Sequence, residues 1–135
     1  MRIVGLDWGE ARIGVSVSDP LGITAQPLVS LENNESFIGK LKEIIKKYDA
    51  TEVVLGYPKQ MNGKAGISAA KVIDFREKIK GELPVKITLW DERLTTKIAQ
   101  QALSESGASR KRKKSFIDAA ASGIMLQNYM DSRKQ

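Results

Sequence analysis

Residues 1–19 constrain the fold more than any other stretch of the chain. Two runs in which apolar residues alternate with other types, 3–7 and 13–18, are separated by the short segment Trp8-Gly9-Glu10-Ala11. Alternation with period two is typical of half-buried strands, and a glycine in so short a connection favours a tight hairpin. The first run ends on a carboxylate, Asp7. The sequence therefore predicts a β-hairpin with an acidic side chain at the end of its first strand.

The rest of the chain predicts a mixed sheet. After a turn at 19–22, residues 23–31 indicate a third strand, which Pro27 places at a sheet edge because proline cannot donate to a strand ladder. Helices and strands then alternate: the pattern predicts helices at about 35–48, 66–80, 95–106 and 116–131, a short buried strand at 53–55 and a fifth strand at 85–90. This order is typical of an α/β domain with an antiparallel meander of three strands, followed by parallel strands reached through crossovers. We expect one domain over residues 1–135.

Two missing residue types limit the chemistry. The chain has no cysteine and no histidine, which excludes disulfides, thiolate nucleophiles and a Ser-His-Asp triad. Any metal must be held by oxygen atoms, and this favours Mg²⁺ or Mn²⁺. No apolar run approaches the roughly twenty residues that are needed to cross a bilayer. Asp7 interrupts the N-terminal apolar run, whereas the apolar run of a signal peptide is continuous. We therefore expect a cytoplasmic protein without a membrane partner.

The positive charge is concentrated in one place. The formal net charge is +6, and a single run supplies most of it: Arg110, Lys111, Arg112, Lys113 and Lys114. A basic cluster of this kind favours a polyanionic partner such as nucleic acid. We expect the run to form a loop directly before the last helix. Charge alone leaves open the alternative that this loop is merely solvated.

Three carboxylates occupy comparable places in the predicted fold. Ligands of open α/β sheets bind at the carboxyl ends of the parallel strands; Asp7 ends the first strand and Glu92 follows the fifth. Asp118 lies in a helix that is apolar on nearly every side, where an ionised acid is costly unless it is paired or bound to metal.

Each acid also has a structural alternative. Asp7 could open a turn, Glu92 could pair with a neighbouring cation, and Asp118 could form a capping box with Ser115. Their convergence in a basic, histidine-free chain favours a phosphodiester hydrolase that uses two metal ions.

Several cations lie next to the acidic positions and are candidates for binding backbone phosphates: Arg12, Lys59, Lys64, Arg93 and Lys97. Arg12 and Arg93 are the strongest candidates, because a guanidinium can bind phosphate through two hydrogen bonds. A solvated surface charge is the alternative for each of them. Trp8 could stack on a base, although packing beside the hairpin is the favoured interpretation.

Four segments resemble one known family. They are Ile3 to Asp19, Gly56-Tyr57-Pro58 with Met61-Asn62-Gly63, Asp91-Glu92-Arg93-Leu94-Thr95-Thr96, and Lys114-Ser115-Phe116-Ile117-Asp118-Ala119-Ala120-Ala121. Together they are similar to the motifs of the YqgF/RuvX family of RuvC-like nucleases with an RNase H fold. The motifs stand in the family's order and span nearly the whole chain; Asn62 departs from the aspartate that the family often has there.

The resemblance implies an RNase H-like sheet of five strands, the second antiparallel, with helices on both faces. It also implies that Asp7, Glu92 and Asp118 are catalytic acids that bind Mg²⁺ or Mn²⁺. Family members are described as Holliday junction resolvases or as nucleases that mature precursor 16S rRNA. RuvC resolvases carry a further acid one turn after the last-helix aspartate, where this chain has Ala121.

We therefore expect a metal-dependent nuclease, monomeric or homodimeric, that processes precursor 16S rRNA, a structured RNA. Cleavage of branched DNA as a Holliday junction resolvase is one alternative. The other is a non-catalytic nucleic-acid-binding module with the same fold.

Overall fold

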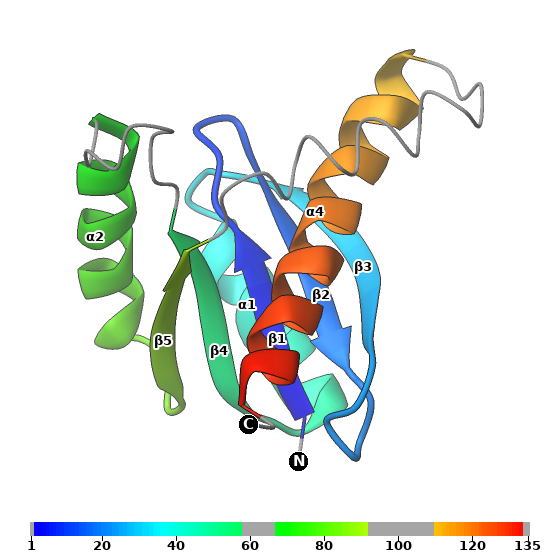
Figure 1. Ribbon diagram of the computed structural model, residues 1–135. Coiled ribbons are helices and arrows are strands. Elements are labelled where there is room, and N and C mark those ends of the chain that lie inside the picture. Colours follow the sequence, from blue (N-terminus) through cyan, green and yellow to red (C-terminus); the bar gives the residue numbers. More distant parts are fainter. Residues whose placement is uncertain (1, 58–66, 92–109, 134–135) are drawn as a thin grey trace.

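The structure, a computed structural model, describes residues 2–57, 67–91 and 110–133. A mixed five-stranded sheet with strand order β3-β2-β1-β4-β5 forms its centre (Figure 1). The strands are β1 (Arg2–Asp7), β2 (Arg12–Ser18), β3 (Ala25–Glu32), β4 (Ala50–Tyr57) and β5 (Lys86–Asp91). β1, β2 and β3 are antiparallel neighbours, whereas β1, β4 and β5 run parallel. This arrangement confirms the predicted meander followed by parallel strands.

Helices cover both faces of the sheet, as expected. α1 (Phe37–Tyr48) and α2 (Ile67–Lys80) lie on one face, and α4 (Arg110–Ser132) lies along the other (Figure 1). Each face has its own hydrophobic core. Under α1 and α2 the buried residues include Val4, Leu6, Ile13, Val15, Phe37, Leu41, Val53, Leu55, Val72 and Ile79. Under α4 they are Ile3, Val54, Met125, Leu126, Tyr129 and Met130.

β3 lies at an edge of the sheet, which confirms the prediction from Pro27. Pro27 stands opposite Ser16, at a point where the pairing of β2 with β3 shifts between Val15 and Ser16. The irregular pairing accommodates a residue that has no N–H to donate. No helix in the described ranges is long and apolar enough to span a bilayer.

The last helix begins earlier than the sequence suggested. α4 starts at Arg110 rather than near 116, so the expected basic loop over 110–114 is wrong, and these residues form the first turns of the helix. Lysine and arginine are good helix formers, and nothing in the run interrupts a helix. The capping box of Ser115 with Asp118 is also wrong, because both residues lie inside α4. The helix expected over 95–106 falls outside the described residues.

Candidate active site at the carboxyl edge of the sheet

Asp7 belongs to a lateral row of residues that crosses all five strands. Its Cα pairs with Gly14 of β2 on one side and with Gly56 of β4 on the other. The row continues from Gly14 to Ser30 of β3 and from Gly56 to Trp90 of β5. Asp7 thus has a glycine on both neighbouring strands, so no side chain stands directly beside its carboxylate in the row.

The side chain of Asp7 points to the face that α4 covers. Val4 and Leu6 belong to the core under α1 and α2, and successive residues of a strand alternate between faces. Gly5 and Asp7 therefore share the opposite face. The close approach of α4 at Gly5 agrees with this assignment, because a Cβ built on Gly5 would lie 3.1 Å from Cβ of Leu126.

Asp118 comes to this edge because α4 lies directly on β2. A Cβ on Gly14 would collide with the carbonyl oxygen of Asp118. Further along the helix, Ser122 Oγ donates a hydrogen bond of 2.9 Å to the carbonyl oxygen of Gly5. Small residues, Gly14 of β2 and Ser122 of α4, thus let the helix approach the sheet closely. Since Gly14 is the cross-strand partner of Asp7, the Asp118 backbone lies one strand away from Asp7.

The Asp118 carboxylate is partly buried and bound by two donors. Arg12 Nε donates to Oδ2 over 3.0 Å, and Ser30 Oγ donates to the same oxygen over 3.1 Å. The exposed fractions of the Arg12 and Asp118 side chains are 24% and 27%. Sequence reasoning missed Ser30, because only the pairing of β2 with β3 brings it into the row of Asp7.

The hairpin turn after Asp7 is fixed by Asn33. The Asn33 side chain donates from Nδ2 to the carbonyl oxygen of Gly9 over 2.8 Å, and its backbone N–H donates to the carbonyl oxygen of Ala11 over 2.9 Å. A Cβ on Gly9 would lie 2.5 Å from the Arg12 carbonyl oxygen, so the compact turn requires glycine. Trp8 packs against the core under α1 and α2, which supports packing over stacking on a base.

The remaining predicted site residues are placed in part. Tyr57 pairs with Asp91, so β5 ends at the same edge as β1 and β4, one residue before Glu92. The backbone of 110–114 forms the end of α4 that rises past this edge (Figure 1). Outside the described residues lie Lys59, Lys64, Glu92, Arg93 and Lys97.

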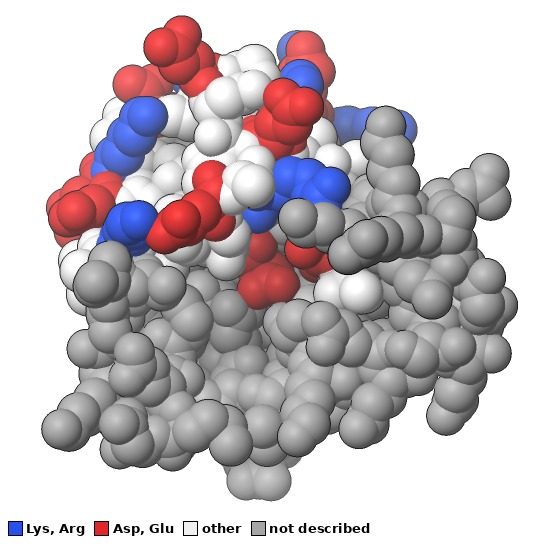
Figure 2. Space-filling model, turned by 90° about the horizontal axis from the view of Figure 1, so that it is seen from above, with Lys and Arg blue, Asp and Glu red and all other residues white. Residues whose placement is uncertain are grey.

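The described ranges contain two of the three predicted metal ligands, Asp7 and Asp118. No three acidic side chains cluster within those ranges. Figure 2 looks down on the carboxyl edge and shows acidic side chains in a recess near the middle of the molecule, with basic side chains beside them. The edge therefore offers carboxylate oxygens and positive charge side by side.

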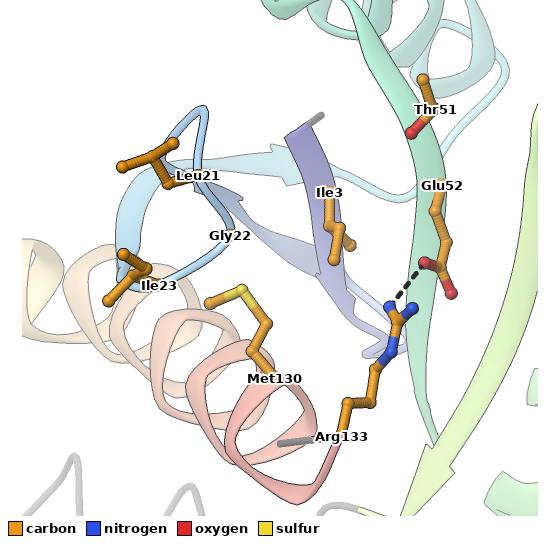
Figure 3. A pocket seen from close by; sticks show the side chains of 8 residues that line it. All are labelled: Ile3, Leu21, Gly22, Ile23, Thr51, Glu52, Met130 and Arg133. Carbon is orange, nitrogen blue, oxygen red and sulfur yellow. Dashed lines mark hydrogen bonds and ion pairs between the residues drawn. The ribbon is translucent and has the colours of Figure 1, made fainter.

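A cavity of about 410 Å³ lies at the other end of the sheet (Figure 3). Arg133 and Glu52 form an ion pair along one side of it, with 3.1 Å between Nη1 and Oε1 (Figure 3). Its lining comes from the starts of β1 and β4, the turn between β2 and β3 and the end of α4: Ile3, Leu21, Gly22, Ile23, Thr51, Glu52, Met130 and Arg133. The cavity is thus separate from the row of Asp7.

Solved structures with a similar fold include Holliday junction resolvases. T. thermophilus RuvC in complex with a Holliday junction substrate has a TM-score of 0.55 and 17% identity, with 99% of this chain and 96% of that chain covered. The fowlpox virus resolvase in complex with Holliday junction DNA has a TM-score of 0.57 and 16% identity, with both chains fully covered at 100%. At this identity the likeness concerns the fold, and it confirms the predicted RNase H-like sheet.

Sequence relatives are much closer. A Clostridium acetobutylicum protein provisionally named pre-16S rRNA nuclease is 46% identical over 134 residues, covering 98% of this chain and 99% of the relative. A Clostridium beijerinckii protein with the same name is 46% identical over 138 residues, covering 99% and 100%. The family model described as "RuvX: Holliday junction resolvase" matches residues 1–132. With motifs, fold and full-length relatives in agreement, the chain belongs to the RuvX (YqgF) family.

Proposed function

We propose that this protein is a cytoplasmic nuclease that depends on a divalent metal and hydrolyses phosphodiester bonds in precursor 16S rRNA. The observation that carries the proposal is that the Asp118 backbone packs on Gly14, the cross-strand partner of Asp7, so that both acids belong to one edge of the sheet. Family membership supports it, since full-length relatives at 46% identity are named for this activity.

The donor set suits Mg²⁺ or Mn²⁺. Both described acids offer only carboxylate oxygens, the ligands that these hard cations prefer, and the chain has no histidine or cysteine to favour softer metals. Asp7 and Asp118 would hold the metal together with Glu92, which follows the end of β5 at the same edge. When bound, such ions activate a water molecule and stabilise the charge that develops on the phosphate.

The cations around this edge would bind the nucleic-acid backbone. Positive side chains that neutralise phosphates supply affinity without reading sequence. We assign this role to Lys59, Lys64, Arg93 and Lys97 and to the run from Arg110 to Lys114 at the start of α4.

Cleavage of branched DNA is the second candidate, because the structural neighbours include resolvases bound to Holliday junctions. The residue one turn after Asp118 argues against the resolvase. Ala121 has no side-chain oxygen, so this position lacks the further acidic ligand that RuvC resolvases carry there.

Cleavage assays with Mg²⁺ or Mn²⁺ test the proposal. The substrates are a precursor 16S rRNA fragment and a four-way DNA junction. Wild-type protein is expected to cut the RNA. Asp7→Asn and Asp118→Asn should still bind the RNA but cut it more than about 100-fold more slowly. Such a loss exceeds the roughly 10–100-fold that removal of a residue contacting only a metal ligand usually costs. Asp49→Asn is the matched control at the far end of α1. Equal cleavage by wild type and Asp7→Asn would contradict the role of Asp7, and preference for the junction would favour the resolvase.

A further inference from the structure

We infer that Arg12 and Ser30 position Asp118 as a metal ligand, and that Arg12 serves this purpose rather than binding a backbone phosphate. The inference rests on the proposed function, because it concerns one of the proposed metal-binding acids. We refer to these two residues as the Arg12–Ser30 clamp. The clamp joins α4 to two neighbouring strands, β2 and β3.

The two oxygens of the Asp118 carboxylate differ in their hydrogen bonds. Arg12 Nε and Ser30 Oγ both donate to Oδ2, over 3.0 and 3.1 Å. No described residue donates to Oδ1. Two donors arriving from different strands fix the plane and the rotation of the carboxylate. Oδ1 is then the oxygen that is left to bind a metal.

The sheet holds the backbones of both donors, Arg12 and Ser30, in place. Ser30 pairs with Gly14 in the row of Asp7, and Arg12 begins β2 opposite Glu32, so both backbones belong to the sheet ladder. The Arg12 side chain is mostly buried, with 24% exposed. Its Nη2 atom is buried and has no hydrogen-bond partner among the described residues. A guanidinium enclosed in this way, with Nε bound to Asp118, is poorly placed to reach a phosphate in solvent.

Orientation of Asp118 by the clamp raises metal affinity, whereas the positive charge of Arg12 lowers it. Outer-shell partners that orient a metal ligand typically contribute 10–100-fold in metal affinity. A cation close to the site also repels the metal, so a variant that removed the Arg12 charge would combine lost orientation with lost repulsion, whereas Arg12→Lys keeps the charge. Ser30 is uncharged and therefore reports the orientation effect alone.

The test is a titration of the full chain with Mn²⁺ in the absence of nucleic acid. Electron paramagnetic resonance measures the concentration of free Mn²⁺ at each point of the titration. We expect Ser30→Ala and Arg12→Lys each to weaken Mn²⁺ binding by about 10–100-fold. Ser30→Thr keeps the hydroxyl and should restore binding. Arg2→Lys is the matched control, because Arg2 lies at the opposite end of β1 and stacks on Tyr48. Unchanged or tighter Mn²⁺ binding in both Ser30→Ala and Arg12→Lys would overturn the inference.

Two further measurements separate positioning from phosphate binding. In cleavage assays the clamp variants should lower kcat and leave KM for the RNA unchanged. Binding of RNA to Arg12→Gln in EDTA should keep the wild-type dependence on salt. A salt slope reduced by about 0.7–0.9, the value for one lost phosphate contact, would instead assign Arg12 to the backbone and overturn the inference.

Asp118→Asn makes failure of the proposed function recognisable. If this variant binds Mn²⁺ as wild type does, Asp118 is not a metal ligand, and the proposed function and the clamp both fall. If Asp118→Asn loses Mn²⁺ while the clamp variants retain it, the proposed function stands and the clamp alone is wrong.

Discussion

Gly14 leaves room for the backbone that carries Asp118 to lie on the strand next to Asp7. Gly14 is the cross-strand partner of Asp7 and lies under the Asp118 carbonyl. Its backbone does not adopt a positive φ, the conformation that Gly22 has in the turn before β3. Gly14 is therefore needed for space and not for conformational freedom. The absence of a side chain lets the α4 backbone rest on β2.

Gly14→Ala should destabilise the protein and impair the site. The added methyl collides with a helix backbone that no rotamer change can move, and overpacking of this kind costs about 1–3 kcal/mol. Urea unfolding measures the loss. Gly39→Ala is the control, since nothing lies within 4 Å of a Cβ there and helix α1 should gain about 0.5–1 kcal/mol. Wild-type stability in Gly14→Ala would show that α4 does not pack as described.

At the scale of elements, α4 carries Asp118, and hydrogen bonds near its middle and at its end hold it to the sheet in addition to the Arg12–Ser30 clamp. Near the middle, Ser122 Oγ donates a hydrogen bond to the carbonyl oxygen of Gly5, and a second hydrogen bond of 2.8 Å joins it to Ser16 Oγ. At the end of the helix, Tyr129 OH donates to the buried carboxylate of Glu52 over 2.7 Å. Further donors to Glu52 are Thr88 over 2.8 Å and Arg133 over 3.1 Å. The helix is thus held to the sheet from Asp118 to its carboxyl end.

The hydrogen bond from Tyr129 to Glu52 at the end of α4 should weaken at alkaline pH. Burial, and then the hydrogen bond to Glu52, raises the pKa of Tyr129 above its ordinary value of 10.0. A raised pKa in the folded state gives stability that is fully present below the unfolded pKa and is lost as pH rises through the folded one. Tyr129→Phe should be less stable than wild type by about 1.5–3 kcal/mol near neutral pH, the range for a hydrogen bond to a charged group. This difference should shrink above about pH 10. Urea unfolding at several pH values checks it, and a constant difference would contradict it.

The sequence predicted the elements better than their contacts. Alternation along 3–7 and 13–18 identified the hairpin and the place of Asp7, because a period-two pattern fixes which face each side chain takes. The same pattern does not fix which residues of β2 and β3 stand opposite each other. That pairing shifts at Pro27 and is what brings Ser30 to Asp118. The start of α4 was missed for a local reason, since a run of cations has strong helix propensity but no apolar period.

At the scale of the whole molecule, charge is distributed unevenly along α4. The run 110–114 forms its first turns, and no acidic residue is present in the first turn. The amino end of a helix carries a partial positive charge, so cations there are locally unfavourable. A polyanion bound at this end would relieve the repulsion. The same end of α4 extends past the carboxyl edge of the sheet (Figure 1). Asp7 ends β1 at this edge, and the Asp118 backbone packs on Gly14 beside it. The arrangement favours a nucleic-acid backbone that approaches Asp7 and Asp118 along the start of α4.

Replacing Arg110, Lys111, Arg112, Lys113 and Lys114 by glutamine should therefore weaken RNA binding and flatten its salt dependence. Each phosphate contact contributes about 0.7–0.9 to the slope of log affinity against log salt, so several lost contacts reduce the slope by several times that value. Fluorescence anisotropy from low to high salt measures it. The control replaces five lysines from the other end of the strands and helices, Lys46, Lys47, Lys78, Lys80 and Lys86, which changes the net charge equally. If both variants lose the same slope, RNA responds to net charge alone. A loss confined to the first variant places the nucleic acid along α4, beside the acids that would cut it.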